Sequence, residues 1–387
     1  MHTKPRHCIM FLHYSNKQSA TELYNQIPTC ELIKQNTIDS PNKLIIGDIL
    51  LVLKNLIAEQ QLAGKIDLVY LAPPLGLTTQ FSFSEEYNTK KQQQQKGWLH
   101  AIDFLEFLRA RLFLLKALLS EQGAIYVQID SSIGHYVKIV MDEIFGADNF
   151  RNDISKICHA PYQKHPKAYH TIKDMVLFYT KSSQGIWNED KRTYAPEDIV
   201  RLFPKVDANG RRYTTISLYS PRENFEHKEG VLPFRGIVPP TGQYWQVSTA
   251  ILEQWDKDNL IDWTDRQHPR KKIYADEHPT ALPYDIWEDN RSSSLSPFIE
   301  LMLRKSSLPN SYVLDCYCGS NAATLQAAQL LGRKWIGVDE SATAIQAICE
   351  KFKANDIFSQ KVTYELLKAT SQEDDEDNLR YMLTKFF

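Results

Sequence analysis

The chain has 387 residues, of which 43% are hydrophobic and 24% charged, and its net charge is −2. This composition is typical of a soluble globular protein with two domains, or with one domain that carries a large insertion. No segment approaches the roughly 18 apolar residues that span a bilayer, and the apolar run at 8–12 is too short and badly flanked for a signal peptide. The six cysteines are scattered, which excludes a disulfide framework and indicates free thiols in a cytoplasmic protein.

Strands and helices alternate in the chain after residue 43. Apolar runs that end at turn residues predict strands, and apolar residues at helical spacing predict the segments between them. The predicted strands are 44–48, 66–71 and 123–130, and the predicted helices are 49–62, 98–120 and 135–145. This alternation indicates a parallel sheet with covering helices.

The character of the sequence changes from residue 151 to about residue 283. This stretch is aromatic, basic and interrupted by proline, with short strand-like pieces such as 175–179. Residues 151–235 contain 15 Lys and Arg against 10 Asp and Glu, whereas residues 373–377 are all acidic. A basic stretch of this kind suits contact with phosphates, but an ordinary solvated surface explains the charge equally well.

The alternation then resumes after the inserted stretch. The predicted helices are 297–305, 322–331 and 342–352, and the predicted strands are 312–315 and 335–339. We therefore expect an α/β fold in which two halves of one doubly wound, mostly parallel sheet flank an insertion. The expected segments are an N-terminal extension at 1–40, a first half at 41–150, an inserted module at 151–280, a second half at 281–360 and a tail at 361–387.

The second half carries a pattern that is typical of nucleoside-binding folds. The strand ending at Asp315 leads into a turn of small residues, Cys316 to Ser320, and a second strand ends at Asp339. In Rossmann-like folds such a turn lets the backbone approach the ligand, and the second acid takes the ribose hydroxyls. A plainer account stays open, in which Asp48, Asp315 and Asp339 accept hydrogen bonds from turn amides.

Further segments make the pattern specific. They are Gly47-Asp48, the Pro73-Pro74 turn and the stretches 125–130, 135–146, 173–179 and 331–339. With them, residues 40–355 resemble the beta class of DNA amino-methyltransferases, in which the catalytic half precedes the cofactor half and a target-recognition region lies between. The resemblance implies a Rossmann-like methyltransferase sheet, S-adenosylmethionine as cofactor, DNA as partner and target recognition by residues 151–280.

The catalytic motif of the family is altered in this chain. Family members use Asp-Pro-Pro-Tyr or a close variant, whose carboxylate and first proline carbonyl accept hydrogen bonds from the amine while the ring stacks on a flipped-out base. This chain has Ala72-Pro73-Pro74-Leu75 instead. Losing a positioned polar group costs about two to four decades of rate, and losing the stacking ring costs roughly 1–3 kcal/mol.

The resemblance also assigns the cofactor residues. They are Asp48, Asp315, Cys318, Gly319, Ser320 and Asp339. The second glycine of the family turn is replaced by Asn321, and a Thr-Gln-Lys-Pro-like segment is reduced to Ser294-Leu295-Ser296-Pro297. We therefore expect weak or vestigial cofactor binding.

The remaining candidates concern DNA, metals and histidines. Basic residues of the inserted module that could contact DNA are Lys164, Lys167, Arg211, Arg212, Arg222 and Arg235. Cys316 and Cys318 have no second Cys or His pair nearby, so no metal site is expected. His135 and His170 lie in segments that match the family scaffold and are interpreted as structural.

Three hypotheses follow from this sequence. The first is a non-catalytic subunit that recognises or positions DNA for a homologous, catalytically intact partner in a heterodimer. The second is an active adenine-N6 or cytosine-N4 methyltransferase with an atypical catalytic loop, which needs an acceptor at position 72 or a substitute from elsewhere. The third is a pseudoenzyme with a role that does not involve nucleic acid.

Overall fold

The computed structural model describes residues 11–14, 17–73, 90–157, 172–189, 196–221, 228–277, 285–288, 296–354 and 362–371. The chain divides into two compact units. The larger is formed by Met1–Glu189 and Tyr284–Phe387, and the smaller by Asp190–Pro283. No helix in the described ranges has the length and apolar character needed to cross a membrane.

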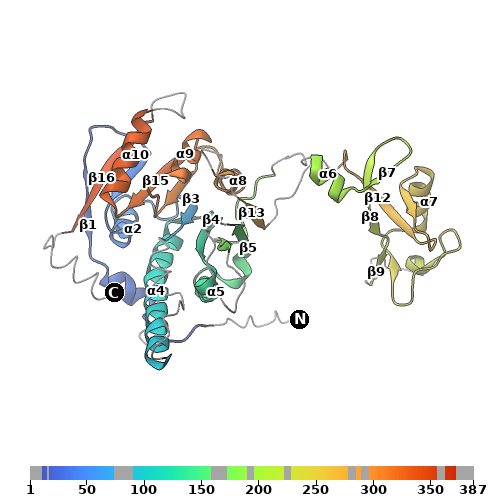
Figure 1. Cartoon of the computed structure of the whole chain (residues 1–387), viewed down its shortest axis with the longest axis horizontal. Helices are drawn as coiled ribbons and strands as arrows, with labels where there is room; N and C mark the ends of the chain where they lie inside the picture. Colours follow the sequence, from blue (N-terminus) through green and yellow to red (C-terminus); the bar gives the residue numbers. More distant parts are fainter. Residues whose placement is uncertain are drawn as a thin grey trace. The chain divides into compact units, whose positions relative to one another are not determined.

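The larger unit is built on one sheet of ten strands, in the order β1-β16-β2-β15-β14-β3-β4-β6-β5-β13 (Figure 1). The strands are β1 Cys30–Lys34, β2 Lys43–Ile46, β3 Ile66–Leu71, β4 Leu119–Asp130, β5 Phe150–Ile157, β6 Lys173–Thr180, β13 Ile286–Glu288, β14 Tyr312–Asp315, β15 Lys334–Asp339 and β16 Glu365–Ser371. Neighbours from β16 through β4 are parallel, whereas β6 is antiparallel to β4 and β5, and β1 is antiparallel to β16. The expected mostly parallel, Rossmann-like sheet is confirmed.

Helices cover both faces of this sheet. They are α1 Ala20–Gln26, α2 Ile49–Ala58, α4 Lys90–Leu118, α5 Ser131–Phe145, α8 Pro297–Ser306, α9 Ala323–Leu330 and α10 Ala342–Ala354, with a short 3-10 turn, η1, at Ala147–Asn149. Their starts follow from sequence: Asp48 caps α2, Asp130 caps α5, and Ser296 caps α8 ahead of a proline in the first turn.

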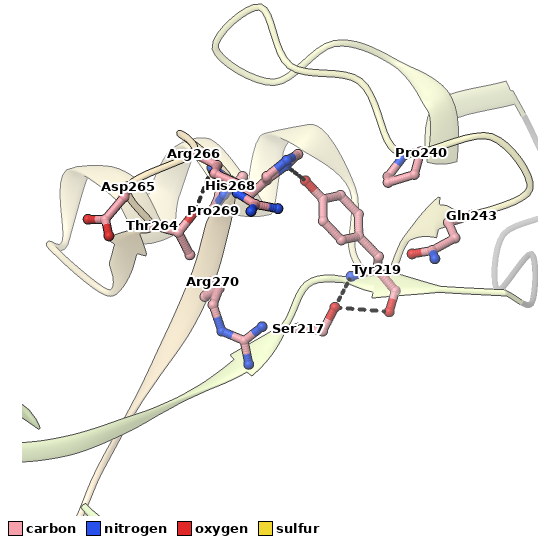
Figure 2. A pocket seen from close by; sticks show the side chains of 10 residues that line it. All are labelled: Ser217, Tyr219, Pro240, Gln243, Thr264, Asp265, Arg266, His268, Pro269 and Arg270. Atoms are coloured by element: carbon pink, nitrogen blue, oxygen red, sulfur yellow. Dashed lines mark hydrogen bonds between the residues drawn. The ribbon is translucent and has the colours of Figure 1, made fainter. Parts of the chain in front are cut away.

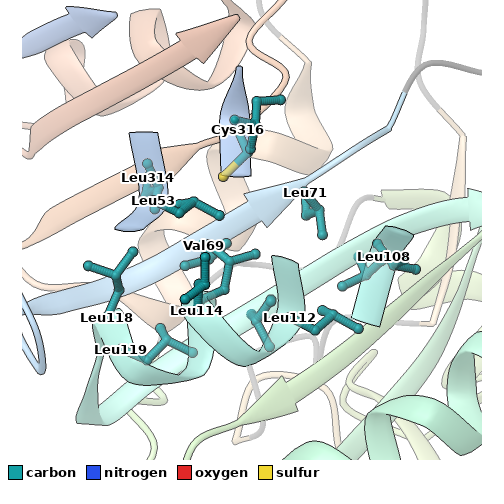
Figure 3. Close-up of a cluster of buried hydrophobic side chains, with 14 of the residues drawn as sticks. Leu53, Val69, Leu71, Leu108, Leu112, Leu114, Leu118, Leu119, Leu314 and Cys316 are labelled. Carbon is teal, nitrogen blue, oxygen red and sulfur yellow. The ribbon is translucent and has the colours of Figure 1, made fainter. Parts of the chain in front are cut away.

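Successive residues of the central strands enter two different cores. Val69 and Leu71 of β3 pack with α2, α4 and α5, whereas Leu68 and Tyr70 pack with α8, α9 and α10. Figure 3 shows the first core, where leucines of α4 lie along β3 beside Val69 and Leu71. Strands that are buried on both faces read as continuous apolar runs, which is why the sequence located them well.

Three expected boundaries differ from the structure. The compact smaller unit begins at Asp190 rather than at residue 151, because β5 and β6 pair with each other and β6 pairs with β4. The expected N-terminal extension contains β1, and the expected tail contains β16, which lies between β1 and β2 in the sheet. Both ends of the chain therefore contribute strands to the larger unit.

The smaller unit has its own sheet and core. Its sheet has the order β11-β12-β8-β7, and a separate pair is formed by β9 and β10. The elements are β7 Lys205–Val206, β8 Arg212–Ser217, β9 Tyr219–Ser220, β10 Tyr244–Trp245, β11 Ile261–Trp263, β12 Pro269–Tyr274, α6 Pro196–Leu202, α7 Thr249–Lys257 and the 3-10 turn η2 Lys228–Val231. Trp245 is fully buried in a cluster with Leu218, Phe234, Leu252 and Ile261.

Candidate functional site

Four loops that carry candidate residues share one edge of the large sheet. Strands β2, β15, β14 and β3 are parallel neighbours in this order, so their carboxyl ends lie together. Asp48, Asp339, Asp315 and Ala72 stand at or just after these ends. Ligands of open α/β sheets bind outside the carboxyl ends of the strands, so the topology brings these positions to one candidate site.

The turn after β14 combines a buried acid with an open glycine. Asp315 is 3% exposed and accepts hydrogen bonds from the backbone N–H of Tyr317, at 3.2 Å, and from the Thr324 side chain. Burial raises the pKa of Asp315 to about 7, because the charged form loses its hydration. Gly319 has a φ of +56° and open space where a Cβ would stand, so the backbone is accessible there.

The other two acids hold the loops of the same edge together. Asp339 accepts hydrogen bonds from the backbone N–H groups of Gly319 and Ser341, both at 2.9 Å. Asp48 accepts one from Leu51 at 3.0 Å as the cap of α2. These are the turn contacts that the plainer account of the acids requires. A carboxylate has about four lone-pair sites, so both acids keep acceptor capacity for a ligand.

The residue that replaces the second family glycine turns away from Gly319. Asn321 is exposed, and its Oδ1 accepts a hydrogen bond of 2.8 Å from Nζ of Lys351 on α10. Besides Gly319, the turn has a second left-handed residue, Ala322, with a φ of +49°. A left-handed alanine costs roughly 1–2 kcal/mol, so the turn holds strain where a glycine would hold none.

These residues fit the nucleoside part of S-adenosylmethionine. Asp339 would take the ribose hydroxyls, and the backbone at Gly319 and Ser320 would lie against the ligand. The cofactor, when bound, supplies the methyl group. Cys318 is 6% exposed and burial raises the pKa of its thiol, so it forms part of the wall as a neutral group.

The position after β3 lacks a hydrogen-bonding side chain. Ala72 is half-buried against the second core and Pro73 is buried, while Pro74 and Leu75 lie outside the described residues. The methyl side chain of Ala72 cannot accept a hydrogen bond from an amine. The backbone carbonyl of Pro73 can accept such a hydrogen bond.

A polar network that sequence reasoning missed runs across β3, β4, β6 and β5. The Gln128 amide donates to Asp174 Oδ2 at 2.7 Å and accepts hydrogen bonds from Tyr70 and from Lys156. Asp174 is 8% exposed. Gln128 comes one residue after Val127, which pairs with Leu71, so this network stands close to position 72 along the sheet.

Two further charged groups near the cofactor turn were also missed. Arg111 of α4 is 4% exposed, donates to the Phe107 carbonyl at 3.0 Å and forms no ion pair with a carboxylate of the described residues. Burial raises the pKa of Glu340, and the charge of Arg111 opposes that shift. Burial likewise raises the pKa of Tyr317, again against the charge of Arg111.

Metal chemistry has no visible support at this edge. Cys316 is fully buried, and burial raises the pKa of its thiol. In the ranges that the structure describes, no three His, Cys, Asp or Glu residues are grouped as metal ligands. His135 is exposed on α5, and His170 lies outside the described residues.

The basic candidates of the inserted module are engaged within the protein. Arg211 pairs with Asp276 at 2.8 Å and with Glu277 at 2.7 Å, and Arg235 pairs with Asp256. Arg212 is half-buried, with a long hydrogen bond of 3.4 Å to the Phe203 carbonyl. Three further candidates lie outside the described residues, namely Lys164, Lys167 and Arg222.

Comparison with known proteins identifies the family of the chain. Residues 66–350 match the family model described as DNA methylase. The chain is 30% identical over 335 residues to the type II methyltransferase M.EcaI of Enterobacter cloacae, covering 83% of this chain and 72% of the relative. It is 27% identical to the StyLTI Mod subunit, from a type III restriction-modification enzyme of Salmonella typhimurium, covering 88% of this chain and 58% of that subunit.

A solved structure, the M1.HpyAVI-SAM complex, covers 80% of this chain and 98% of its own, with 13% identity and a TM-score of 0.40. The family match spans more than half of the chain, and the relative from Enterobacter cloacae is similar over most of its own length. The chain belongs to the DNA methylase family.

Proposed function

We propose that this chain is a non-catalytic member of the family that recognises or positions DNA for a homologous, catalytically intact subunit. The observation that carries the proposal is Ala72, which stands where family members place the carboxylate that engages the target amine. The lone pair of an exocyclic amine is delocalised into the base ring, so transfer depends on acceptors that draw the nitrogen towards a nucleophilic geometry. Leu75 offers no aromatic face to the base at the same motif.

The retained scaffold supports a binding role. The sheet, both cores and the acids of the cofactor edge are formed, while the groups expected to act on the amine are altered. A subunit that contributes only recognition needs its fold and its DNA contacts but not the acceptor at position 72. Several altered positions in one chain, Ala72, Leu75 and Asn321, fit the loss of selection on chemistry better than a single tolerated substitution.

A second candidate function is an active methyltransferase in which Asp174 substitutes for the missing acceptor. The buried carboxylate of Asp174 and its Gln128 partner favour it, because Gln128 lies on β4, the neighbour of β3, and Asp174 lies on β6, the next strand along the sheet. Against it, Asp174 already accepts a hydrogen bond from the Gln128 side-chain amide, and position 75 is still leucine. Abolition of methyl transfer by Asp174→Asn in an active preparation would establish this alternative.

The proposal includes weak binding of S-adenosylmethionine, since Ala322 carries backbone strain and the second family glycine is absent. Titration calorimetry of the full chain with the cofactor should show binding weaker than low-micromolar. Low-micromolar binding would contradict this part of the proposal and leave the role of Ala72 untouched. A role on DNA also implies a cytoplasmic location.

The test of the proposed role uses a homologue from the same genome that keeps the Asp-Pro-Pro-aromatic motif. We expect the two chains to co-purify as a heterodimer, and methylation by the homologue to become faster or more site-selective when this chain is present. Adding the chain with Ala72→Asp should change this stimulation little, because the proposal assigns no chemistry to position 72. Equal methylation of the same sites by the homologue with and without this chain would overturn the proposal.

A further inference from the structure

The smaller unit contains an open, largely apolar hollow with several polar side chains at its walls, and none of the expected DNA-contact residues line it. Its volume is about 520 Å³, and its walls come from β8 and β9, from the loop before β10 and from the turn between β11 and β12 (Figure 2). The polar side chains that matter for its chemistry are Arg266, His268, Arg270, Gln243 and Tyr219.

Arg270 is oriented at the wall of this hollow by one residue. Its Nε donates to the Thr215 hydroxyl at 2.9 Å, and its Nη2 donates to the Thr215 carbonyl at 3.0 Å. A guanidinium has five N–H donors in a fixed planar fork, so these two bonds leave the paired N–H groups at the Nη1 and Nη2 end. A planar fork held in this way is preorganised for two acceptors that lie side by side.

The wall opposite Arg270 is also held in place. The Tyr219 hydroxyl lies 3.2 Å from Nδ1 of His268, and the Tyr219 ring stacks on the buried Trp245 with centroids 4.9 Å apart. His268 is held further by two hydrogen bonds with Thr264. Its carbonyl accepts one from the Thr264 backbone N–H, and its own backbone N–H donates one to the Thr264 hydroxyl. These contacts hold Tyr219 and His268 in place at the hollow.

The lining of the hollow carries two arginines and one acid. Within the described ranges, no ion pair includes Arg266 or Arg270, and the acid of the lining, Asp265, is exposed at the turn. By contrast, the carboxylates around Arg211 and Arg235 neutralise those two charges. A fixed arginine fork, an amide side chain and an exposed arginine are the groups that proteins use on base edges and phosphates.

We propose that this hollow is the surface through which the chain reads DNA sequence, with Arg270 as a specificity-determining residue that binds a base edge with two adjacent acceptors, as guanine presents. Arg266, at the exposed turn, contacts a phosphate and positions the unit. The inference rests on the proposed role in DNA recognition and names the side chains that perform it. Guanine O6 and N7 match the end-on fork of an arginine, whereas a phosphate can be satisfied by any cation.

The experiment uses the full chain and a duplex library with a randomised central segment, with the retained DNA sequenced. Enrichment of a sequence by the wild-type chain tests the proposed DNA role itself, and its failure would remove that role and this inference together. Given enrichment, Arg270→Lys should keep the salt dependence of binding and lose the preference for one G·C pair by roughly 5- to 150-fold. Lysine keeps the charge but has no planar fork.

Two matched variants separate the roles. Arg266→Gln should weaken binding to all DNA sequences alike. It should also reduce the slope of the logarithm of the binding constant against the logarithm of the salt concentration, the salt slope, by about one. Lys271→Gln is the control, because Lys271 is the next residue of β12 and lies over the Trp255 ring at 3.8 Å, so its side chain projects from the other face of the strand. It should leave the sequence preference intact.

Two results for Arg270 variants would overturn the inference. If Arg270→Lys leaves the enriched sequence unchanged, Arg270 does not read a base, and the inference fails even when the wild-type chain binds DNA specifically. A smaller salt slope in Arg270→Gln with an unchanged preference would identify a phosphate contact and overturn it as well. Comparable melting temperatures of the variants show that a lost preference is not lost folding.

Discussion

At the scale of single residues, Asp315 is a buried carboxyl group whose ionisation opposes folding near neutral pH. Its pKa is raised to about 7 in the folded chain, against an ordinary value of 3.8. Folding therefore takes up a proton between these two pH values, so stability falls as pH rises through this window and stays low above it. The full difference corresponds to roughly 4 kcal/mol.

Asp315→Asn should therefore stabilise the chain at pH 8 by about 1–4 kcal/mol, because the amide keeps an acceptor for Tyr317 and carries no charge. The gain should be smaller at pH 5, where the wild-type carboxyl is largely protonated in the folded state. Urea unfolding at both pH values measures it. An equal effect at pH 5 and pH 8 would show that Asp315 does not titrate in this window.

The residues that sequence reasoning located well are those at strand ends. Asp48, Asp315 and Asp339 were placed by apolar runs that stop at an acid, and the structure puts them at one edge. Arg111 and Asp174 were missed because their environment depends on which elements pack together. A charge within an apolar helix or strand has the same appearance in sequence whether it is buried or exposed.

At the scale of elements, the central strands were predictable and the outer ones were not. Strand β16 lies between β1 and β2 and pairs with both, although these strands come from the other end of the chain. Short-range periodicity carries no information about such partners. The same limit explains why β5 and β6 were assigned to the inserted module rather than to the main sheet.

The importance of β16 can be measured with one substitution. Leu367 is 4% exposed and packs in the first core, so Leu367→Ala should lower the free energy of unfolding by about 2–5 kcal/mol. Ile33 of β1 is a matched control, because it stands opposite Lys368 of β16 and is 47% exposed. Ile33→Ala should cost less than about 1 kcal/mol. Equal losses in denaturant unfolding would mean that β16 does not close the core.

At the scale of the whole molecule, the chain keeps the family order, with the altered catalytic motif before the smaller unit and the cofactor turn after it. Hydrophobic cores are formed in both units, whereas residues 72–75 depart from the family's catalytic motif. This contrast is what a subunit selected for recognition should show. A subunit of this kind should transfer no methyl group by itself.

The most direct measurement is the transfer of labelled methyl groups from S-adenosylmethionine to genomic DNA from several sources by the purified full chain. We predict no incorporation above a blank without protein, because Ala72 offers no acceptor to the target amine and Leu75 offers no ring to the base. An active relative, assayed on the same DNA as a positive control, shows that this DNA can be methylated. Robust incorporation by this chain, abolished by Pro73→Trp, would contradict the account.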